Sequence, residues 1–218
     1  MTPRYHGPGE RDSYHHGNLR EALIAAVLEL IAEHGPTGFS YADVARAAGV
    51  SPAAPYRHFR DRGVLLAEVA RRGFERFAAA LEAAWNQGRP DPAKALEACG
   101  RAYLEFARSE PASFSAMFGP GMAPETDPGL SAAADRAFAV LRRAAEAVSA
   151  TYPGPNRPPA LMMALHVWAT AHGIASLFVG PGRRLRALPI GPEELLEASL
   201  LIYLRGLEPP PGQPGKSD

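Results

Sequence analysis

The fold is decided by the stretch GPTGFSYADVARAAGVSPAAPYRHFRDR, residues 35–62. Ser40 precedes a short segment with apolar residues at helical spacing. Asp43 follows Ser40 by three positions, which is a weaker form of the capping box that begins many helices. Gly49 comes after the segment and can adopt the left-handed conformation that ends helices. The pattern predicts a short helix over residues 40–48.

A second helix is predicted over residues 51–59, after a turn of three to four residues. Ser51 can cap this helix, and Pro52 would occupy its first position, where a missing N–H costs little. Two short capped helices joined by a glycine-containing turn form a helix-turn-helix. Because an α-helix fits the major groove of DNA with its first residues facing the base edges, the stretch predicts a DNA-binding motif.

The candidate DNA-contacting residues are either small, so that the backbone can approach the bases, or carry side chains that donate hydrogen bonds to phosphate. They are Ser40, Tyr41, Ser51, Ala53, Ala54, Tyr56, Arg57, His58, Arg60 and Arg62. The alternative interpretation is an exposed helix end with one buried aromatic residue, Phe59. Phe59 is expected to belong to the core under either interpretation.

The remainder of the chain is also predicted to be helical, because apolar residues recur at helical spacing between breaks rich in Pro and Gly. Further helices are expected over residues 18–34, 64–85, 92–108, 111–118, 129–150, 159–179 and 192–206. No alternating strand pattern is present in the sequence. The fold class is therefore all-α, with about nine helices.

Composition narrows the function. The 218 residues include 23 Lys or Arg and 23 Asp or Glu, so a net charge of zero excludes a bulk polycation. Cys99 is the only cysteine, which excludes an internal disulfide and a cysteine-based zinc site. No long uninterrupted apolar window and no secretory signal are present, so we expect a cytoplasmic protein without a membrane span. No catalytic fingerprint occurs, and we expect no enzyme activity, no cofactor and no metal.

Residues 18–66 resemble the DNA-binding domain of the tetracycline-repressor-like (TetR) family. The resemblance is carried by Ala22 and the apolar stripe around it, Gly35, Ser40, Val44, Ala45, Ala48, Gly49, Val50, Ser51, Tyr56, Arg57, His58, Phe59, Leu65 and Leu66. It implies a three-helix helix-turn-helix domain, with the third helix as the recognition helix. It also implies a larger helical domain that binds an effector and dimerises.

The expected organisation follows from this resemblance. Residues 1–17 would form a flexible arm, residues 18–62 the helix-turn-helix domain, residues 63–207 the effector-binding and dimerisation domain, and residues 208–218 a disordered tail. The last two long helices would form a four-helix bundle with a second copy of the chain.

The sequence departs from the family pattern at two places. Arg62-Gly63 stands where the family has Lys-Glu, and the charge needed for a phosphate contact is kept. Pro55 stands inside the recognition helix in place of an aliphatic residue. Because proline removes an early helical hydrogen bond, it can stiffen or bend that helix. In the C-terminal half, Trp168 and His172-Gly173 are similar to the W…HG signature of one TetR subfamily.

Candidate ligand-binding residues are aromatic, sulfur-containing or polar side chains of the C-terminal half. They are Tyr103, Phe106, Phe114, Met117, Phe118, Met163, His166 and His172. Each could instead be an ordinary core residue, because Met and Phe at helical spacing usually are. His172 could likewise be a satisfied histidine packed beside Trp168 at the dimer contact.

The sequence thus predicts a homodimeric, ligand-responsive transcriptional repressor. Its partners would be double-stranded operator DNA, a second copy of the chain and a small-molecule effector of hydrophobic character. The alternative is a helical adaptor that binds a ligand or protein and does not bind DNA.

Overall fold

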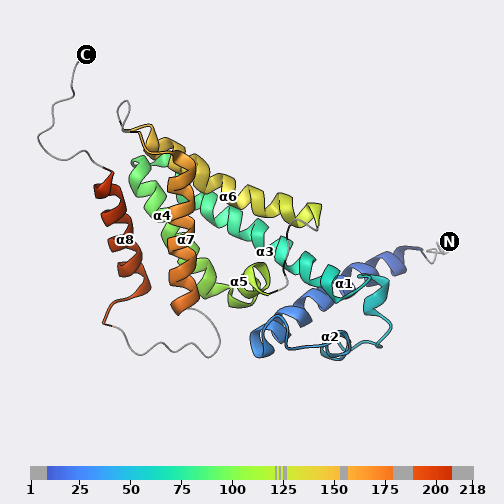
Figure 1. Cartoon of the computed structure of the whole chain (residues 1–218). Helices are drawn as coiled ribbons and strands as arrows, with labels where there is room; N and C mark the ends of the chain where they lie inside the picture. The colour runs from blue at the N-terminus through green and yellow to red at the C-terminus, as the bar shows by residue number, and fades with distance from the viewer. Residues whose placement is uncertain are drawn as a thin grey trace, which may run out of the picture. The chain divides into compact units, whose positions relative to one another are not determined.

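The computed structural model describes residues 9–120, 122, 124, 127–152, 157–178 and 189–207, and only the backbone of residues 9–18. This part of the chain contains α-helices, two short 3-10 helices and no strand, which confirms the all-α prediction (Figure 1). The chain divides into two compact units. Unit 1 comprises Met1–Gly73 and Ala112–Leu130, and unit 2 comprises Phe74–Pro111 and Ser131–Asp218. The boundary expected at residues 62 and 63 therefore falls inside unit 1.

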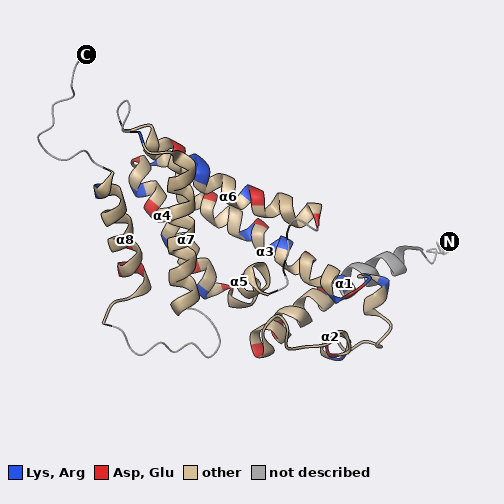
Figure 2. Cartoon of the chain, in the orientation of Figure 1, with Lys and Arg blue, Asp and Glu red and all other residues tan. Residues whose placement is uncertain are grey.

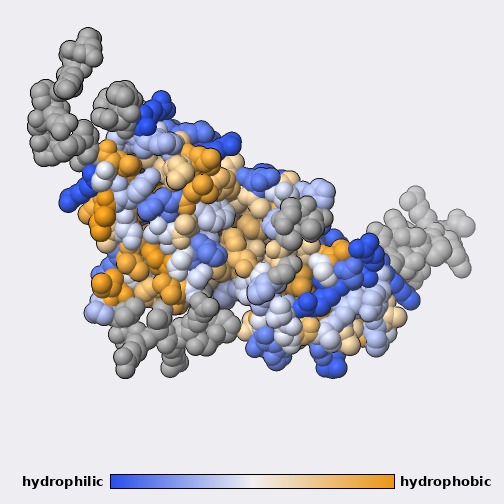
Figure 3. Space-filling view, viewed as in Figure 1, coloured by the Kyte–Doolittle hydropathy of each residue, from blue (hydrophilic) through white to orange (hydrophobic). Residues whose placement is uncertain are grey.

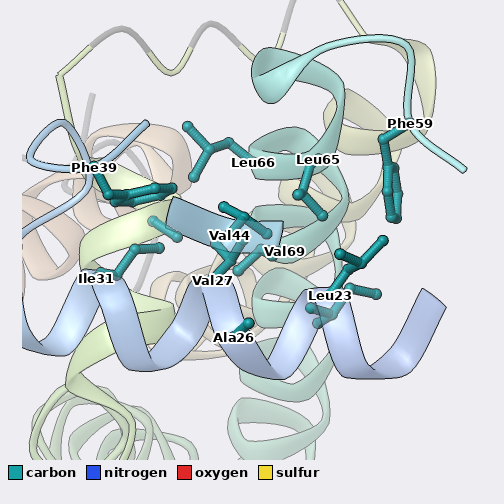
Figure 4. Close-up of a cluster of buried hydrophobic side chains, with 12 residues drawn as sticks. Leu23, Ala26, Val27, Ile31, Phe39, Val44, Phe59, Leu65, Leu66 and Val69 are labelled. Carbon is teal, nitrogen blue, oxygen red and sulfur yellow. The ribbon is translucent and has the colours of Figure 1, made fainter. Parts of the chain in front are cut away.

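Unit 1 is built on α1 (Gly9–His34), α2 (Tyr41–Ala47), the 3-10 helix η1 (Pro55–Arg57), the first part of α3 (Arg62–Trp85) and α5 (Pro111–Phe118). Its core gathers apolar side chains that recur at helical spacing along α1 and α3 and meet α2 between them (Figure 4). The labelled members are Leu23, Ala26, Val27, Ile31, Phe39, Val44, Phe59, Leu65, Leu66 and Val69. This core positions the helix-turn-helix.

The first helix begins earlier than the sequence predicted. The periodicity marked a helix from residue 18, whereas α1 begins at Gly9. Part of the expected flexible arm, residues 9–17, is thus helical in the structure. The expectation of a disordered tail over 208–218 concerns residues outside those that the structure describes.

Unit 2 contains the rest of α3, the 3-10 helix η2 (Asn86–Gly88), α4 (Pro92–Ser109), α6 (Pro128–Ser149), α7 (Ala160–Phe178) and α8 (Pro192–Gly206). Helix α4 packs against both α7 and α8, and α7 also packs against α8. An aromatic cluster lies in this core, where the rings of Tyr103 and Trp168 approach edge-on at 5.7 Å and Phe77 lies 4.9 Å from Tyr103.

Helix α7 is long and apolar enough to cross a membrane by length and composition, with a mean hydropathy of 1.4. In unit 2, one face of α7 is instead buried against other helices. The buried residues are Met163, Ala164, Val167, Ala171, Ile174 and Ala175. Its other face carries exposed apolar side chains.

Candidate nucleic-acid interface

Helix α2 begins with the capping box that the sequence predicted. The Ser40 hydroxyl accepts from the Asp43 backbone N–H, and the Asp43 carboxylate accepts from the Ser40 backbone N–H at 2.9 Å. The Ser40 hydroxyl also donates to the Asp43 carboxylate at 2.6 Å. These hydrogen bonds lower the pKa of Asp43, so the box stays intact at neutral pH. Ser40 therefore has a structural role at the helix start, whatever it contacts in DNA.

The turn after α2 is also as predicted. Gly49 has a φ of +67°, the left-handed region that favours glycine. The Gly49 N–H donates to the Arg46 carbonyl at 3.1 Å, and the Val50 N–H donates to the Ala45 carbonyl at 2.9 Å. This pair of bonds is a Schellman motif, which ends a helix and fixes the direction of the chain that follows.

The α-helix predicted over residues 51–59 is wrong. The structure has turns there and only a three-residue 3-10 helix, Pro55–Arg57. Pro55 has no N–H to donate to the carbonyl of Ser51, so the first hydrogen bond of the predicted α-helix cannot form. Bonds of 3-10 spacing replace it, from the Arg57 N–H to the Ala54 carbonyl at 3.2 Å and from the His58 N–H to the Pro55 carbonyl at 3.0 Å. Of the nine predicted helices, eight are α-helices in the described residues.

We name residues 51–60 the reading segment. Five of its predicted DNA-contacting side chains are exposed to solvent: Ser51, Ala53, Tyr56, Arg57 and Arg60. Tyr56 is 60% exposed, which is unusual for a large aromatic side chain. These residues form the accessible part of the candidate interface.

Two predicted contacts in the segment are less accessible. Ala54 is only 9% exposed, so its methyl group belongs to the packed side of the segment and not to a surface that could meet a thymine methyl. Its burial follows from the turn at Pro55, because the predicted helical register is lost. His58 is partly buried, next to the fully buried Phe59.

Tyr41 lies beneath the reading segment. Its hydroxyl donates to the Phe59 carbonyl at 2.7 Å, across 18 residues of sequence. Its ring meets the Tyr56 ring edge-on, with 4.7 Å between centroids. Burial, together with Tyr56 and Asp61, raises the pKa of Tyr41 to about 12, so the hydroxyl stays protonated at neutral pH.

Arg60 and Arg62 have different surroundings. Arg60 is 87% exposed and pairs with its neighbour Asp61 at 3.2 Å. Arg62 is partly buried: its guanidinium donates to the Pro36 carbonyl and lies 4.4 Å from the centre of the Phe39 ring. Arg62 therefore holds the turn between α1 and α2 to the start of α3. The phosphate contact that the sequence suggested for Arg62 stays a prediction.

An ion-pair cluster that the sequence analysis missed joins α1 to α3. Glu68 accepts from Arg20 at 3.0 Å, from Arg71 at 2.8 Å and from Arg72 at 2.8 Å. Arg72 also pairs with Glu21 at 2.6 Å. Glu68 and Arg72 are four residues apart, a spacing that favours an ion pair on one helix. No spacing rule predicts the pair between Glu68 and Arg20, which are 48 residues apart. Figure 2 shows the mixed charges along these helices.

Glu68 is held in its charged form by this cluster. Burial alone would raise its pKa, but the hydrogen bonds from Arg71 and Arg72 and the charge of Arg20 outweigh burial and lower the pKa to about 2. Because the folded pKa lies below the unfolded value, the stabilisation is complete above about pH 4.5 and is lost as the pH falls toward 2.

We expect Glu68→Gln to lower the free energy of unfolding by about 2–3 kcal/mol at pH 7. The fall in pKa from 4.5 to about 2 corresponds to about 3.5 kcal/mol, and screening by solvent reduces this value. The variant should also lose most of the Glu68 contribution to the pH dependence between about pH 5 and 2. Urea unfolding measured across that range checks both. Glu146→Gln is the control, because the pair that Glu146 forms with Arg142 is exposed. An equal loss in the two variants would contradict the assignment.

The predicted ligand-binding residues of unit 2 are largely core residues. Tyr103 is 1% exposed, and its hydroxyl lies 2.9 Å from Nδ1 of His172, whose pKa is lowered by burial. Phe106 packs on Phe77, and Met163 is fully buried. His166 is stacked on Tyr203 of α8, with ring centroids 3.8 Å apart. That stacking is not predictable from the spacing of the two residues in the sequence.

The other three predicted ligand-binding residues, Phe114, Met117 and Phe118, lie on α5 and belong to unit 1. The rings of Phe114 and Phe118 are 4.9 Å apart. Met117 is 2% exposed and lies against Gly73, where an added Cβ would be 2.7 Å from its sulfur. These residues were predicted to bind the ligand together with those of unit 2, but the two sets belong to different units.

Unit 1 also holds a cavity of about 380 Å³. It is lined by Pro36, Thr37, Arg62, Gly63, Leu66, Ala67, Ala116, Gly119, Pro120, Met122, Asp127 and Leu130. None of the eight predicted ligand-binding residues lines this cavity, while Arg62, predicted for DNA, does.

Two family models match the chain. The model of bacterial regulatory proteins of the tetR family matches residues 23–69, and that of the tetracyclin repressor-like C-terminal domain matches residues 96–202. The first match contains the capped α2, the Gly49 turn and the reading segment. No curated protein sequence matches the chain.

Solved structures show the same architecture. A protein of unknown function from Rhodococcus sp. RHA1 is 33% identical, with a TM-score of 0.71 over 94% of this chain and 98% of that one. The TetR family transcriptional regulator PfmR from Thermus thermophilus is 23% identical, with a TM-score of 0.66 over 87% and 97%. AibR in complex with isovaleryl coenzyme A and operator DNA is 19% identical, with a TM-score of 0.63 over 84% and 97%. The latter two likenesses concern the fold alone.

Proposed function

Because this chain belongs to the tetR family of bacterial regulatory proteins and is a DNA-binding transcription regulator, we propose that it acts as a homodimeric, ligand-responsive repressor that contacts its operator through the reading segment. We further propose that it acts in the cytoplasm, because its DNA partner is found there. The proposal includes no catalytic role.

One observation carries the proposed interface: Tyr56 and Arg57 are both exposed on a short segment whose two ends are fixed. The Schellman turn fixes the start of the segment, and buried Phe59 fixes its end. A guanidinium can pair with phosphate or bidentately with guanine, and a tyrosine hydroxyl can donate to phosphate. Ser51 and Ala53 are small, so the backbone beside them can approach the groove.

The proposed dimer uses an apolar surface on α7 and α8 (Figure 3). The exposed apolar side chains of these helices are Leu161, Met162, Leu165, Leu177, Leu201 and Ile202. An apolar patch of this kind is typical of a surface that is covered in the assembly. A two-fold dimer would present two reading segments, which reach successive major grooves of one duplex when they lie about 34–36 Å apart.

The proposed effector is a small molecule with apolar character. In unit 2, the aromatic cluster around Tyr103 and Trp168 would supply apolar contacts, and the Tyr103–His172 pair would supply polar groups. The effector would weaken DNA binding only if it bound more tightly to a state of the protein that does not bind DNA than to the state that does. Such a difference in effector binding is typically worth about 1–3 kcal/mol. The resemblance of Trp168 and His172-Gly173 to the W…HG subfamily remains a prediction.

Selection from a library of random-sequence duplexes tests the proposed function. We expect the full-length protein to enrich a palindromic site with half-sites about one helical turn apart, and its affinity to fall steeply with salt. An adaptor that does not bind DNA would enrich no sequence, and its residual retention would not depend on the duplex. That result would contradict the proposal.

A further inference from the structure

The reading segment cannot support itself as a helix. It contains two prolines, Pro52 and Pro55, and its regular structure is one 3-10 turn of three residues. A 3-10 turn of this length has poor hydrogen-bond geometry, and short isolated helices are marginal in water. Contacts from outside the segment must therefore hold Tyr56 and Arg57 in place.

Several contacts of this kind are made to Phe59. Its ring is 2% exposed, its carbonyl accepts from the Tyr41 hydroxyl at 2.7 Å, and the guanidinium carbon of Arg20 lies 4.9 Å from its ring centre. Arg20 is itself held by Glu68 at 3.0 Å. Of these contacts, only the hydrogen bond from Tyr41 reaches the backbone of the segment.

Tyr41 also touches the segment at a second point, because its ring packs edge-on against Tyr56. The Phe59 N–H donates to the Pro55 carbonyl at 3.0 Å, so fixing Phe59 also fixes the proline turn that carries Tyr56 and Arg57. Tyr41 thus contacts both an exposed DNA-facing side chain and the anchored end of the segment.

We propose that Tyr41 is a positioning residue for DNA recognition, which orients the reading segment through its hydrogen bond to the Phe59 carbonyl and makes no phosphate contact of its own. The proposal rests on the proposed function of the segment and replaces the direct contact that the sequence suggested for Tyr41. Phosphate oxygens only accept hydrogen bonds. The single hydroxyl proton of Tyr41 is already donated to Phe59, and the hydroxyl is partly buried.

The test is Tyr41→Phe in the full-length protein, which removes the hydroxyl and keeps the ring against Tyr56. Two quantities are measured: hydrogen exchange of the DNA-free protein over residues 51–60, and affinity for the duplex that the wild-type protein selects. Losing one such hydrogen bond should make local opening of the segment about fivefold more frequent and its amide exchange correspondingly faster. Affinity should fall, by up to about fivefold for each reading segment of the dimer, because fewer molecules are binding-competent.

Tyr152→Phe is the matched control, since the Tyr152 hydroxyl donates to the Leu204 carbonyl in unit 2. We expect this variant to keep wild-type exchange in the segment and wild-type affinity. If Tyr41→Phe weakens binding but leaves exchange of the free segment unchanged, Tyr41 contacts DNA directly and the proposal is overturned. Unchanged affinity overturns it as well. Failure of the wild-type protein to select any duplex would instead contradict the proposed function.

Discussion

We expect the double variant Tyr56→Ala, Arg57→Ala to lose operator binding, with affinity at least a thousandfold below that of the wild-type protein. Each lost contact to phosphate or base is worth about 1–3 kcal/mol, and a dimer loses four of them. The fold should survive, because both side chains are exposed and belong to no part of the unit 1 core. Gel-shift titration on the selected duplex measures the loss.

Salt dependence identifies which part of this loss involves phosphate. If Arg57 meets a phosphate in each subunit, Arg57→Ala should reduce the slope of log affinity against log salt by about two. Arg142→Ala is the control, because Arg142 is similarly exposed but lies on α6 in unit 2. Retained affinity in the double variant, or equal losses in Arg57→Ala and Arg142→Ala, would refute the assigned interface.

The second large effect concerns assembly. Leu165→Glu combined with Ile202→Glu should convert the dimer into a monomer and weaken operator binding at least a hundredfold. Leu165 is 46% exposed and Ile202 is 73% exposed, so the added charges cost little in an isolated chain. In the proposed dimer they would be buried without partners, which is strongly unfavourable. A monomer also cannot place two reading segments on one duplex.

Sedimentation at micromolar concentration measures the oligomeric state of this variant. Ala132→Glu adds a charge at an exposed position of α6 and is the control, expected to remain dimeric. A wild-type chain that sediments as a monomer, or a double variant that remains a dimer, would show that the α7 and α8 surface has another role.

The sequence predicted the helices well where the residues that start or end a helix act on their immediate neighbours. Prolines at the first turn mark α4, α5 and α8, whose predicted starts at residues 92, 111 and 192 agree with the structure. The capping box of Ser40 and the left-handed Gly49 were equally readable, because each depends on neighbours within a few residues. Local rules of this kind need no knowledge of the tertiary fold.

The candidate site was less predictable, because its contacts are long-range. No spacing rule reveals that Tyr41 reaches Phe59, or that Arg62 reaches Pro36. The effect of Pro55 was underestimated: treated as one missing hydrogen bond, it in fact replaces the recognition helix by a 3-10 turn and buries Ala54. We predicted that Ala54 faces the bases because we assumed an α-helix over residues 51–59. Pro55 removes that helix, and the side of the segment on which Ala54 lies changes with it.

Hydrogen exchange of the wild-type protein with and without its selected duplex tests the central claim most directly. We expect DNA to slow amide exchange most strongly over residues 51–60, with Tyr56 and Arg57 at the centre of the protected region. Strong protection elsewhere in the chain, with unchanged exchange over those ten residues, would contradict the assignment of this segment as the DNA-binding surface.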